Sequence, residues 1–457
     1  MVSFPASNAY AASLASYFTL QQTDIHPECI VSPKTAQDVS KIVKVVAGGD
    51  SQTPHCLFAV RSGGHSTNAG ASNIQGGVTI DLRGLDSIEL NEERSVVTIG
   101  SGITWGSLYS YLDPLNLGVV GGRGYSVGAG GVVTGGGISY FSPRYGWACD
   151  TVLNFEVVLA NGSIINANDE RNTDLLWALR GGTNNFGIVT RIKLLSFPQG
   201  DLWGGNTIHA MSTEEQEIAA LSRFSTGPYD EYASLIGTFR YDETGPSIIN
   251  SIEYTKVDET PRIFQEFFEI PAQSITLGVA NMTALSSGTE AMQMIGERAA
   301  YATVTIRPTT EAINATVRAW NESLTIIRDI ADIAWALSLE PLPPSIYARH
   351  AGENTLGLED RHNKPLMVVL LSVTWSDLED DNRVTSEMKS LISTIELDVG
   401  RLDALDPYIY LNYAAAWQDP IRSYGRSNLD RLAKVRIAYD PGNVFVDYVP
   451  GGFKIPG

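Results

Sequence analysis

The segment Arg61–Ser66 reads Arg-Ser-Gly-Gly-His-Ser and places one histidine in a short glycine turn beside a cation and two hydroxyls. Glycine lets the backbone come close to a bound group, and successive N–H groups in such a turn bind anionic groups. An imidazole there is either a hydrogen-bonded structural residue or a group that acts on whatever the turn holds. The role of His65 is therefore the first question that the sequence raises.

Two further glycine-rich segments follow, Val120–Gly137 and Gly181–Val189. Each by itself is compatible with an ordinary tight turn. Together with Arg61–Ser66 they predict a site for a large cofactor that carries phosphate. A Rossmann site is not indicated, because Gly128–Gly137 does not lie between an opening strand and a helix with an acidic residue about 20 positions further on.

The elements that must position these segments alternate between strands and helices. Cys29–Gly48 reads as a strand, a Ser-Pro break and an amphipathic helix, and Leu57–Ser66 is a strand that leads into the glycine turn. Val152–Ala167 has the pattern of a hairpin with an Asn-Gly turn. The first part of the chain is therefore expected to mix helices and strands.

The pattern changes after Gly200. Strands such as Pro365–Trp375 alternate with amphipathic helices such as Glu214–Phe224 and Ala312–Ile330, without glycine clusters, as far as about Asp406. This pattern predicts a second domain in which helices cover a sheet.

The tail has a strand-like stretch around Tyr408–Trp417 and a helix over Asn428–Tyr439. It is too short for a core of its own. We expect it to pack back onto an earlier domain.

Composition excludes several classes of protein. The 457 residues include 51 acidic and 32 basic side chains, a formal charge of −19, which opposes binding to nucleic acid. No apolar run reaches the roughly 18 residues of a membrane span, so we expect no membrane partner. The three cysteines, Cys29, Cys56 and Cys149, have no metal-ligand spacing, and we expect no metal site. A Cys29–Cys56 disulfide and free buried thiols both remain open.

The amino-terminal residues lack the basic and apolar regions of a signal peptide. The chain is then either cytoplasmic, or its signal has been replaced by Met1. Asn-x-Ser/Thr sequons begin at Asn161, Asn281, Asn314 and Asn321 and favour a secreted glycoprotein.

Several motifs together carry a resemblance to a known family. They are Arg61–Ser66, Val127–Ser139, Ser142–Gly146 and Gly181–Val189, with Tyr-Leu-Asn-Tyr at Tyr410–Tyr413 and Asp-Pro-x-Asn-x-Phe at Asp440–Phe445. The chain resembles the vanillyl-alcohol-oxidase superfamily with a PCMH-type FAD-binding domain, and most closely the fungal berberine-bridge-enzyme-like oxidases. The resemblance extends from about Cys29 to the end of the chain.

The resemblance implies an α+β fold in three parts. Residues 22–199 would form a two-lobed FAD-binding domain. Residues 200–406 would form a substrate domain whose antiparallel sheet is covered by helices and faces the flavin ring. Residues 407–457 would return to the FAD domain.

The family also implies a role for His65, which matches the histidine bonded through a ring nitrogen to the flavin 8α-methyl group. Such a bond secures the FAD and makes it a better hydride acceptor. Many relatives have a second bond from a cysteine, but Gly124 stands at that position. A single covalent link is therefore expected, with Cys149 a buried structural residue.

Val127 matches the family's oxygen gate, where a small side chain is typical of oxidases. The same match assigns cofactor contacts to Arg61, Ser62, Gly63, Gly64, Ser66, Val127, Gly128, Gly130, Gly131, Thr134, Gly135, Gly136, Gly137, Asn185, Phe186, Gly187, Val189 and Asn412.

Tyr413 matches a tyrosine that faces the flavin and is the first candidate for the catalytic base. A phenol would act as a base only if its pKa fell well below about 10, which needs a nearby cation or the field of the flavin. Other polar residues that could line a substrate cavity are Tyr347, His350, Glu353 and Asn354, although an exposed loop position also explains Glu353.

These observations predict a flavin-dependent oxidase that dehydrogenates a small organic molecule, such as an alcohol, an amine or a secondary metabolite, and reduces O2 to H2O2. Its partners would be that substrate and O2. The alternatives are an oligosaccharide oxidase, a dehydrogenase with another electron acceptor, and a non-redox cyclase or binding scaffold that retains flavin as structure.

Overall fold

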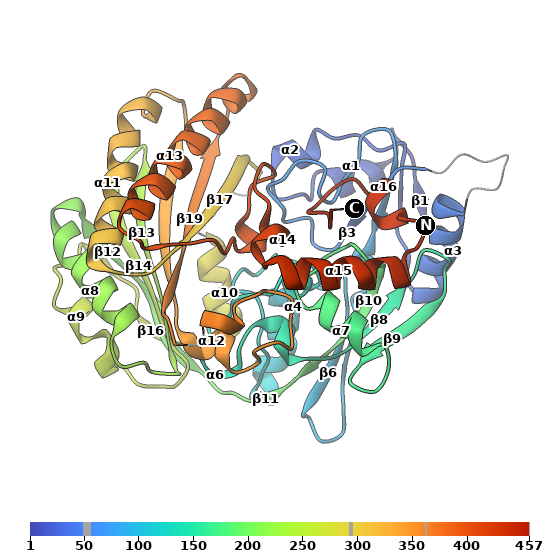
Figure 1. The fold of residues 1–457 in the computed structure, drawn as a ribbon, viewed down its shortest axis with the longest axis horizontal. Helices are drawn as coiled ribbons and strands as arrows, with labels where there is room; N and C mark the ends of the chain where they lie inside the picture. Colours follow the sequence, from blue (N-terminus) through green and yellow to red (C-terminus); the bar gives the residue numbers. More distant parts are fainter. Residues whose placement is uncertain (49–55, 292–295, 362, 457) are drawn as a thin grey trace.

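The computed structural model describes residues 1–48, 56–291, 296–361 and 363–456. Two units lie side by side in Figure 1, a first unit with small sheets and a second unit with one large sheet. The predicted α+β class, with an antiparallel sheet covered by helices after a mixed first part, is confirmed.

The first unit contains two main sheets. One has the strand order β1-β2-β4-β3, in which β2, β4 and β3 pair in parallel, and the other has the antiparallel order β5-β6-β10-β8-β9. A two-stranded pair, β11-β7, completes it. The strands are β1 Val2–Ser3, β2 Cys29–Val31, β3 Phe58–Arg61, β4 Val78–Asp81, β5 Ile88–Leu90, β6 Val96–Gly100, β7 Leu117–Gly118, β8 Val152–Val158, β9 Ile164–Asn168, β10 Ile188–Leu195 and β11 Phe197–Pro198.

Short helices connect and cover these strands. The predicted strand-to-helix unit and the Asn161–Gly162 hairpin are confirmed by α3 and by the pairing of β8 with β9. A short helix, α5, lies inside the glycine-rich segment, where the sequence pattern predicted none. The helices are α1 Asn8–Leu14, α2 Leu20–Thr23, α3 Ala36–Ala47, α4 Trp105–Leu112, α5 Ala129–Thr134, α6 Ser142–Tyr145 and α7 Thr173–Leu179.

The second unit is built on one antiparallel sheet with the order β15-β12-β14-β13-β18-β19-β17-β20, to which β16 adds by pairing with β12. The strands are β12 Leu202–Ala210, β13 Ala233–Asp242, β14 Gly245–Tyr254, β15 Ser274–Ile275, β16 Gly278–Ala280, β17 Arg298–Ile306, β18 Ala334–Leu342, β19 Leu366–Trp375 and β20 Leu405–Asp406.

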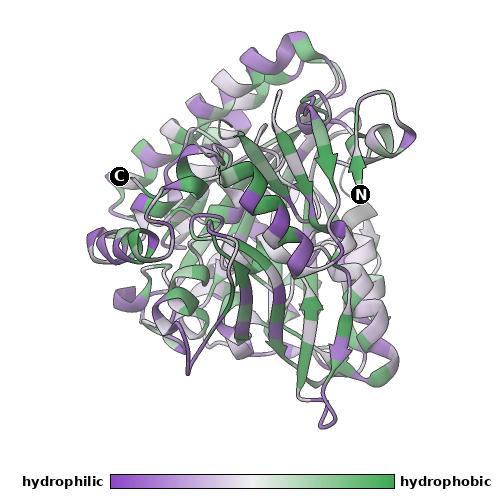
Figure 2. Ribbon diagram, turned by 90° about the vertical axis from the view of Figure 1, so that its right-hand side faces the viewer, coloured by the Kyte–Doolittle hydropathy of each residue, from purple (hydrophilic) through white to green (hydrophobic). Residues whose placement is uncertain are grey.

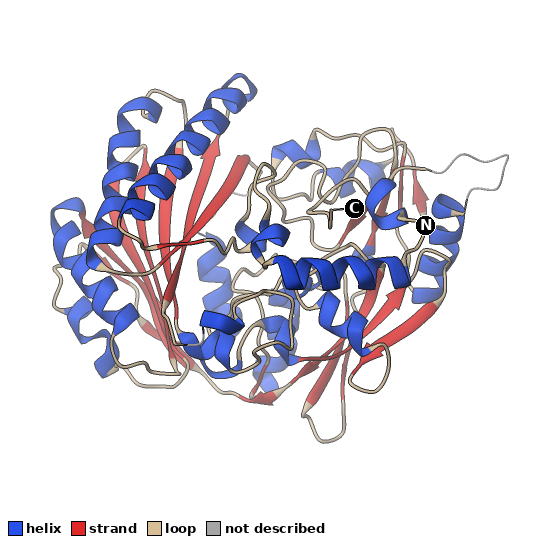
Figure 3. Ribbon diagram, viewed as in Figure 1, coloured by secondary structure: helices blue, strands red, loops and turns tan. Residues whose placement is uncertain are grey.

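Helices α8 (Glu214–Thr226), α11 (Thr310–Ile327) and α13 (Asp381–Arg401) cover the outer face of this sheet (Figure 3). The alternation within each strand explains the arrangement, because successive side chains point to opposite faces. On β13, Leu235 and Phe239 are buried in the core beneath the helices, whereas Ile236, Thr238 and Arg240 are only half-buried. The face without helices therefore looks toward the first unit.

Three smaller helices, α9 (Gln265–Phe268), α10 (Met282–Ala291) and α12 (Pro344–Ala348), complete the second half of the chain before the tail. Figure 2 shows hydrophobic residues along most of the strands and hydrophilic residues on the outer helices and in the loops. No helix in the described residues is long and apolar enough to cross a membrane.

The tail returns to the first unit and passes in front of it in Figure 1. Its helices are α14 Pro420–Ser423, α15 Arg426–Tyr439 and α16 Val444–Asp447. The expected strand around Tyr413 is wrong: Leu411–Tyr413 is a 3₁₀ helix, closed by a hydrogen bond from the Tyr413 N–H to the Tyr410 carbonyl. Phe445 and Val449 are buried against β3 and β4, as the expected packing onto an earlier domain requires.

The cysteines are free thiols. Cys29 is half-buried, Cys56 is exposed and Cys149 is buried. The disulfide alternative is therefore not realised. Burial and the neighbouring Asp150 carboxylate raise the pKa of Cys149 well above its ordinary value, which fits the structural role expected for it.

Candidate functional site

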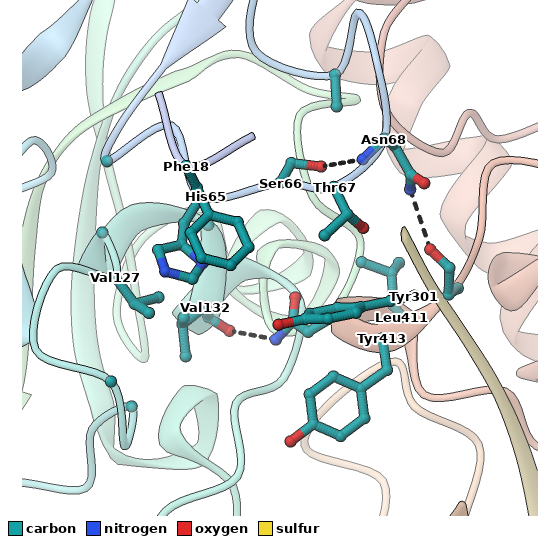
Figure 4. A pocket seen from close by; sticks show the side chains of 18 of the residues that line it. Phe18, His65, Ser66, Thr67, Asn68, Val127, Val132, Tyr301, Leu411 and Tyr413 are labelled. Atoms are coloured by element: carbon teal, nitrogen blue, oxygen red, sulfur yellow. Dashed lines mark hydrogen bonds between the residues drawn. The ribbon is translucent and has the colours of Figure 1, made fainter. Parts of the chain in front are cut away.

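A cavity of about 550 Å³ lies between the first unit and the open face of the large sheet. Its walls come from the histidine loop, the glycine-rich segment around α5, the loop before β10, the sheet and the tail. Figure 4 shows His65, Val127 and Val132 from the first unit on one side and Tyr301, Leu411 and Tyr413 on the other. Segments far apart in sequence thus meet at one site.

The histidine loop is held from behind by Arg61. Its guanidinium is fully buried, donates to the carbonyls of Ser13 and Ser16 at 2.7 Å each, and lies 3.7 Å from the centre of the Tyr17 ring. Gly64 follows with φ +81°, a conformation that favours glycine. Arg61 therefore shapes the loop and does not line the cavity.

Two glycine backbones touch where this loop meets α5. A Cβ on Gly63 would lie 2.5 Å from the Gly128 nitrogen, and a Cβ on Gly128 would lie 2.3 Å from the Gly63 nitrogen. Gly63 and Gly128 are thus required for the close approach of the two segments.

His65 lies in the cavity wall with its ring stacked on Phe18, the ring centres 3.8 Å apart (Figure 4). Burial lowers its pKa to about 4, so the imidazole is neutral near pH 7. Its Nε2 is buried and has no hydrogen-bond partner among the described residues. A buried, neutral and unpartnered ring nitrogen beside a glycine cradle fits a histidine that bonds to a flavin.

The structure divides the other predicted cofactor contacts into two groups. Those that line the cavity are Ser62, Gly63, Gly64, Ser66, Val127, Gly128, Gly130, Gly131, Thr134, Gly187, Val189 and Asn412. Asn412 also ties the tail to α5, because its amide donates to the Val132 carbonyl at 3.1 Å.

The remaining predicted contacts lie behind the cavity wall. Gly136 and Gly137 accept hydrogen bonds from the Cys149 and Ala148 N–H groups, and Gly135 ends α5. Asn185 donates to the Gly182 and Phe453 carbonyls, and Phe186 is in the hydrophobic core. These five residues have structural contacts, and Thr183 and Asn184 line the cavity in place of Asn185 and Phe186.

A buried polar cluster lies opposite His65. Arg123 forms an ion pair with Glu340 and also donates to the Tyr413 hydroxyl at 2.5 Å. The Tyr413 hydroxyl in turn donates to Glu340 Oε2 at 3.2 Å. The loop before α5, strand β18 and the tail therefore converge on one carboxylate.

The surroundings of Tyr413, the expected base, raise the pKa of its hydroxyl. The cation that the expectation required is present as Arg123, and it lowers the pKa of Tyr413. Burial and the Glu340 carboxylate outweigh this effect and hold the pKa well above the ordinary value. The assignment of Tyr413 as the base stays a prediction, and the Glu340 carboxylate, which accepts the Tyr413 hydrogen bond, is a second candidate.

Sequence reasoning missed both Arg123 and Glu340. Arg123 lies inside the glycine-rich segment, and the glycines there predict backbone contacts and give no signal for a charged side chain. Glu340 is a charged residue in a strand that is otherwise apolar or hydroxylated, in step with Ala336 and Ser338. That alternation was the available signal.

The expectation that Tyr347, His350, Glu353 and Asn354 line the cavity is wrong, because neither α12, which contains Tyr347, nor the loop after it contributes these side chains to the wall. Tyr347 donates to the Lys364 carbonyl, and His350 pairs with the exposed Glu353 at 3.0 Å. Asn354 donates to Asp150 at 2.7 Å. These side chains are used to fix the loop to its neighbours.

The described residues contain no group of three or more histidine, cysteine or acidic side chains that could hold a metal. The site is therefore defined by its glycine cradle, one histidine and the Arg123–Glu340–Tyr413 cluster.

Family models match both ends of this arrangement. An FAD binding domain matches residues 27–168, and a berberine and berberine-like segment matches residues 409–447. These stretches contain the histidine loop, the α5 segment and the tail around Tyr413.

Related proteins cover the whole chain. Oligopeptidase PhomG' of Diaporthe leptostromiformis is 42% identical over 100% of this chain, which spans only 36% of the length of that protein. FAD-dependent monooxygenase CTB5 of Cercospora beticola is 34% identical over 100% of this chain and 89% of its own length.

Solved structures share the fold. 6-Hydroxy-D-nicotine oxidase of Arthrobacter nicotinovorans superimposes with a TM-score of 0.82 at 20% identity, covering 100% of this chain and 97% of its own. A variant of berberine bridge enzyme in complex with (S)-reticuline gives 0.79 at 19% identity, covering 100% and 96%. The chain belongs to the berberine-bridge-enzyme-like family of FAD-linked oxidoreductases.

Proposed function

We propose that the protein is an oxidase that removes a hydride and a proton from an alcohol or amine of a small organic molecule and passes the two electrons to O2, giving H2O2. The observation that carries this proposal is the Glu340 carboxylate, which faces a cavity that His65 also lines. A base and a flavin tether on two walls of one cavity are what such a reaction needs.

FAD, when bound, supplies the acceptor for the two electrons that leave the substrate carbon. His65 would hold it covalently, and Gly124, which has no thiol, leaves this as the single link. Ser62, Gly63 and the α5 segment offer the backbone and hydroxyl groups that would contact it.

Glu340 accepts the proton that leaves the substrate hydroxyl or amine. Burial opposes the charge of Arg123, but the Glu340 carboxylate more than offsets this and holds the pKa of Arg123 well above its ordinary value, so the guanidinium stays charged. Arg123 keeps Glu340 in place, and the Tyr413 hydroxyl orients the same carboxylate. The proton moves from the substrate heteroatom to a Glu340 oxygen as the C–H bond breaks.

Val127 supports the choice of O2 as acceptor, since its small side chain lines the cavity near His65 (Figure 4). A second candidate is a monooxygenase, which would insert one oxygen atom into the product. It is favoured by the name of the Cercospora beticola relative, FAD-dependent monooxygenase CTB5.

Stopped-flow mixing of the oxidised holoenzyme with alcohols and amines under anaerobic conditions tests the proposal. The flavin absorbance should bleach, and admitting O2 should restore it rapidly with one peroxide per product. Isotope-labelled O2 distinguishes the second candidate, because only a monooxygenase places label in the product. Product formation without bleaching would overturn redox catalysis, and slow reoxidation would indicate a dehydrogenase.

A further inference from the structure

We infer that Arg240 binds an anionic group of the substrate at the far end of the cavity from Glu340, so that the substrate is an elongated, flat aromatic acid or phenolate oxidised at its opposite end. The inference rests on the proposed function, because it takes Glu340 to mark the reacting end.

The charges in the cavity wall are unequally distributed. Among the described residues that line it, the charged side chains are Arg123, Glu340 and Arg240. Arg123 and Glu340 pair with each other. Arg240 pairs through one nitrogen with Asp242 at 2.9 Å, and Asp242 does not line the cavity.

Arg240 therefore keeps donors for a ligand. A guanidinium has five N–H donors in a planar fork that matches a carboxylate or another paired oxygen anion. The Asp242 contact uses one edge and fixes the side chain, whose exposed fraction is 24%. A substrate that covers it would replace water with charge-assisted hydrogen bonds.

Strand register gives the separation of the two ends. Arg240 lies opposite Ala336 on β18, and Glu340 is four residues further along the same strand. At about 3.3 Å per residue this places the two positions roughly 13 Å apart. That span corresponds to two or three fused or linked rings, not to a single ring.

Small side chains make up most of the floor between these ends. Ala336 and Ser338 lie between them on β18, with Ser372 and Leu370 opposite them on β19. The Thr238 and Ser338 hydroxyls contact each other at 2.9 Å. Small side chains on a sheet leave room for a planar ring system, and the hydroxyls can bond to its oxygen substituents.

The same floor does not suit an oligosaccharide, the alternative that the sequence left open. Each sugar ring presents several hydroxyls that lose water on binding and need partners. Between Arg240 and Glu340 the floor offers Ala336, Ser338, Ser372, Thr238 and the apolar Leu370, and the Tyr301 ring lies at its side. This favours an aromatic substrate with few oxygen groups per ring.

The test uses a biphenyl with a methyl group at one para position, which offers no hydroxyl or amine for oxidation, and a carboxylate at the other. Its neutral isostere has a carboxamide in place of the carboxylate. Isothermal titration with the oxidised holoenzyme under anaerobic conditions measures both affinities. We expect the acid to bind about tenfold or more tightly than the amide, the value of one charge-assisted hydrogen bond.

Arg240→Ala should abolish this preference by weakening only the acid, while Arg240→Lys should keep part of it. Arg223→Ala is the matched control, because Arg223 is exposed in a surface ion pair with Glu266 and its loss changes the net charge equally. Equal binding of acid and amide by the wild type, no binding of the acid at millimolar concentration, or equal weakening of both by Arg240→Ala would each overturn the inference.

Failure of the Arg240 assignment can be distinguished from failure of the proposed function. Binding needs no turnover, so the preference for the acid should persist in Glu340→Gln holoenzyme. If the preference is found but no alcohol bleaches the flavin, the assignment of Arg240 stands and the oxidation chemistry fails. If bleaching occurs without a preference, the reverse holds.

Discussion

At the scale of single residues, the reaction depends on which member of the Arg123–Glu340–Tyr413 cluster takes the proton. The carboxylate accepts hydrogen bonds from both neighbours, and the phenol is a donor whose pKa is raised. The Glu340 carboxylate and the Tyr413 hydroxyl therefore have different roles, and substituting each in turn distinguishes these roles.

Glu340→Gln should lower the anaerobic rate of flavin reduction by about 10²–10⁴-fold, the usual worth of a general base. Tyr413→Phe should lower it by about tenfold, because it removes one hydrogen bond from the carboxylate. Stopped-flow absorbance with a saturating alcohol measures both rates. A larger loss in Tyr413→Phe than in Glu340→Gln would contradict the assignment of the base.

The residues of this cluster also show where sequence reasoning stops. His65, Asn412 and most of the predicted glycines stand in local motifs and line the cavity, although Gly135, Gly136 and Gly137 do not. Glu340 meets Arg123 and Tyr413 only because β18, a loop more than 200 residues earlier and the tail converge, with sequence separations of 217 and 73 residues. No local pattern encodes such a meeting.

At the scale of elements, the site depends on the contact between the histidine loop and α5. Gly63→Ala should push the two backbones apart, at a cost of about 1–3 kcal/mol for overpacking, and should lower the flavin-to-protein ratio. Gly288→Ala in α10 is the control, since its added methyl has open space. The ratio of flavin absorbance to protein absorbance measures the flavin content, and thermal unfolding measures the stability. Normal flavin content in Gly63→Ala would refute this role of the contact.

Strand β14 contains a buried carboxyl group, that of Glu253. Burial raises its pKa from 4.5 to about 8, and one of its oxygens has no hydrogen-bond partner among the described residues. The folded protein therefore keeps a proton that the unfolded chain releases. Its contribution to stability is present below about pH 4.5 and is lost as the pH rises toward 8.

Glu253→Gln should consequently be more stable than the wild type at pH 8, by on the order of a few kcal/mol, with little difference at pH 5. Denaturant unfolding at a series of pH values measures this. Exposed Glu215→Gln in α8 is the control and should leave the curve unchanged. Parallel pH curves for Glu253→Gln and the wild type would show that the carboxyl is ionised in the folded protein.

At the scale of the whole molecule, the cavity exists because the two units are fixed to each other. Arg298 at the start of β17 bonds to Asp24 beside α2 at 3.0 Å and to Asp381 of α13 at 2.5 Å. The Gln21 side chain pairs with both backbone groups of Ala299, each at 3.1 Å. The histidine loop and the sheet are thereby held on opposite sides of one cavity.

Arg298→Met should lower the free energy of unfolding by about 1–2 kcal/mol, because it removes the Asp24 bond between the two units and the Asp381 bond within the second, and the guanidinium is buried. Arg401→Met, which removes an exposed pair with Asp398 inside one helix, should cost less than about 0.5 kcal/mol. Chemical denaturation measures both. Equal effects of the two substitutions would show that the Arg298 bridge adds nothing beyond a surface pair.

The sequence predicted the class and the sheet covered by helices from periodic local patterns, and the return of the tail from its being too short for a core of its own. It did not predict α5, where glycines hide the helical pattern, or the 3₁₀ turn at Leu411–Tyr413, where alternating apolar residues imitate a strand. Both elements are fixed by contacts with distant segments, such as the bond between Asn412 and Val132.

We propose that His65 carries the flavin through a covalent bond, and intact-mass spectrometry of the acid-unfolded holoprotein detects such a bond. We expect the mass of the chain plus one FAD, with that addition absent in His65→Ala and retained in the control His26→Ala, since His26 is exposed at the surface. A wild-type chain that appears bare while free FAD is released on unfolding would contradict it.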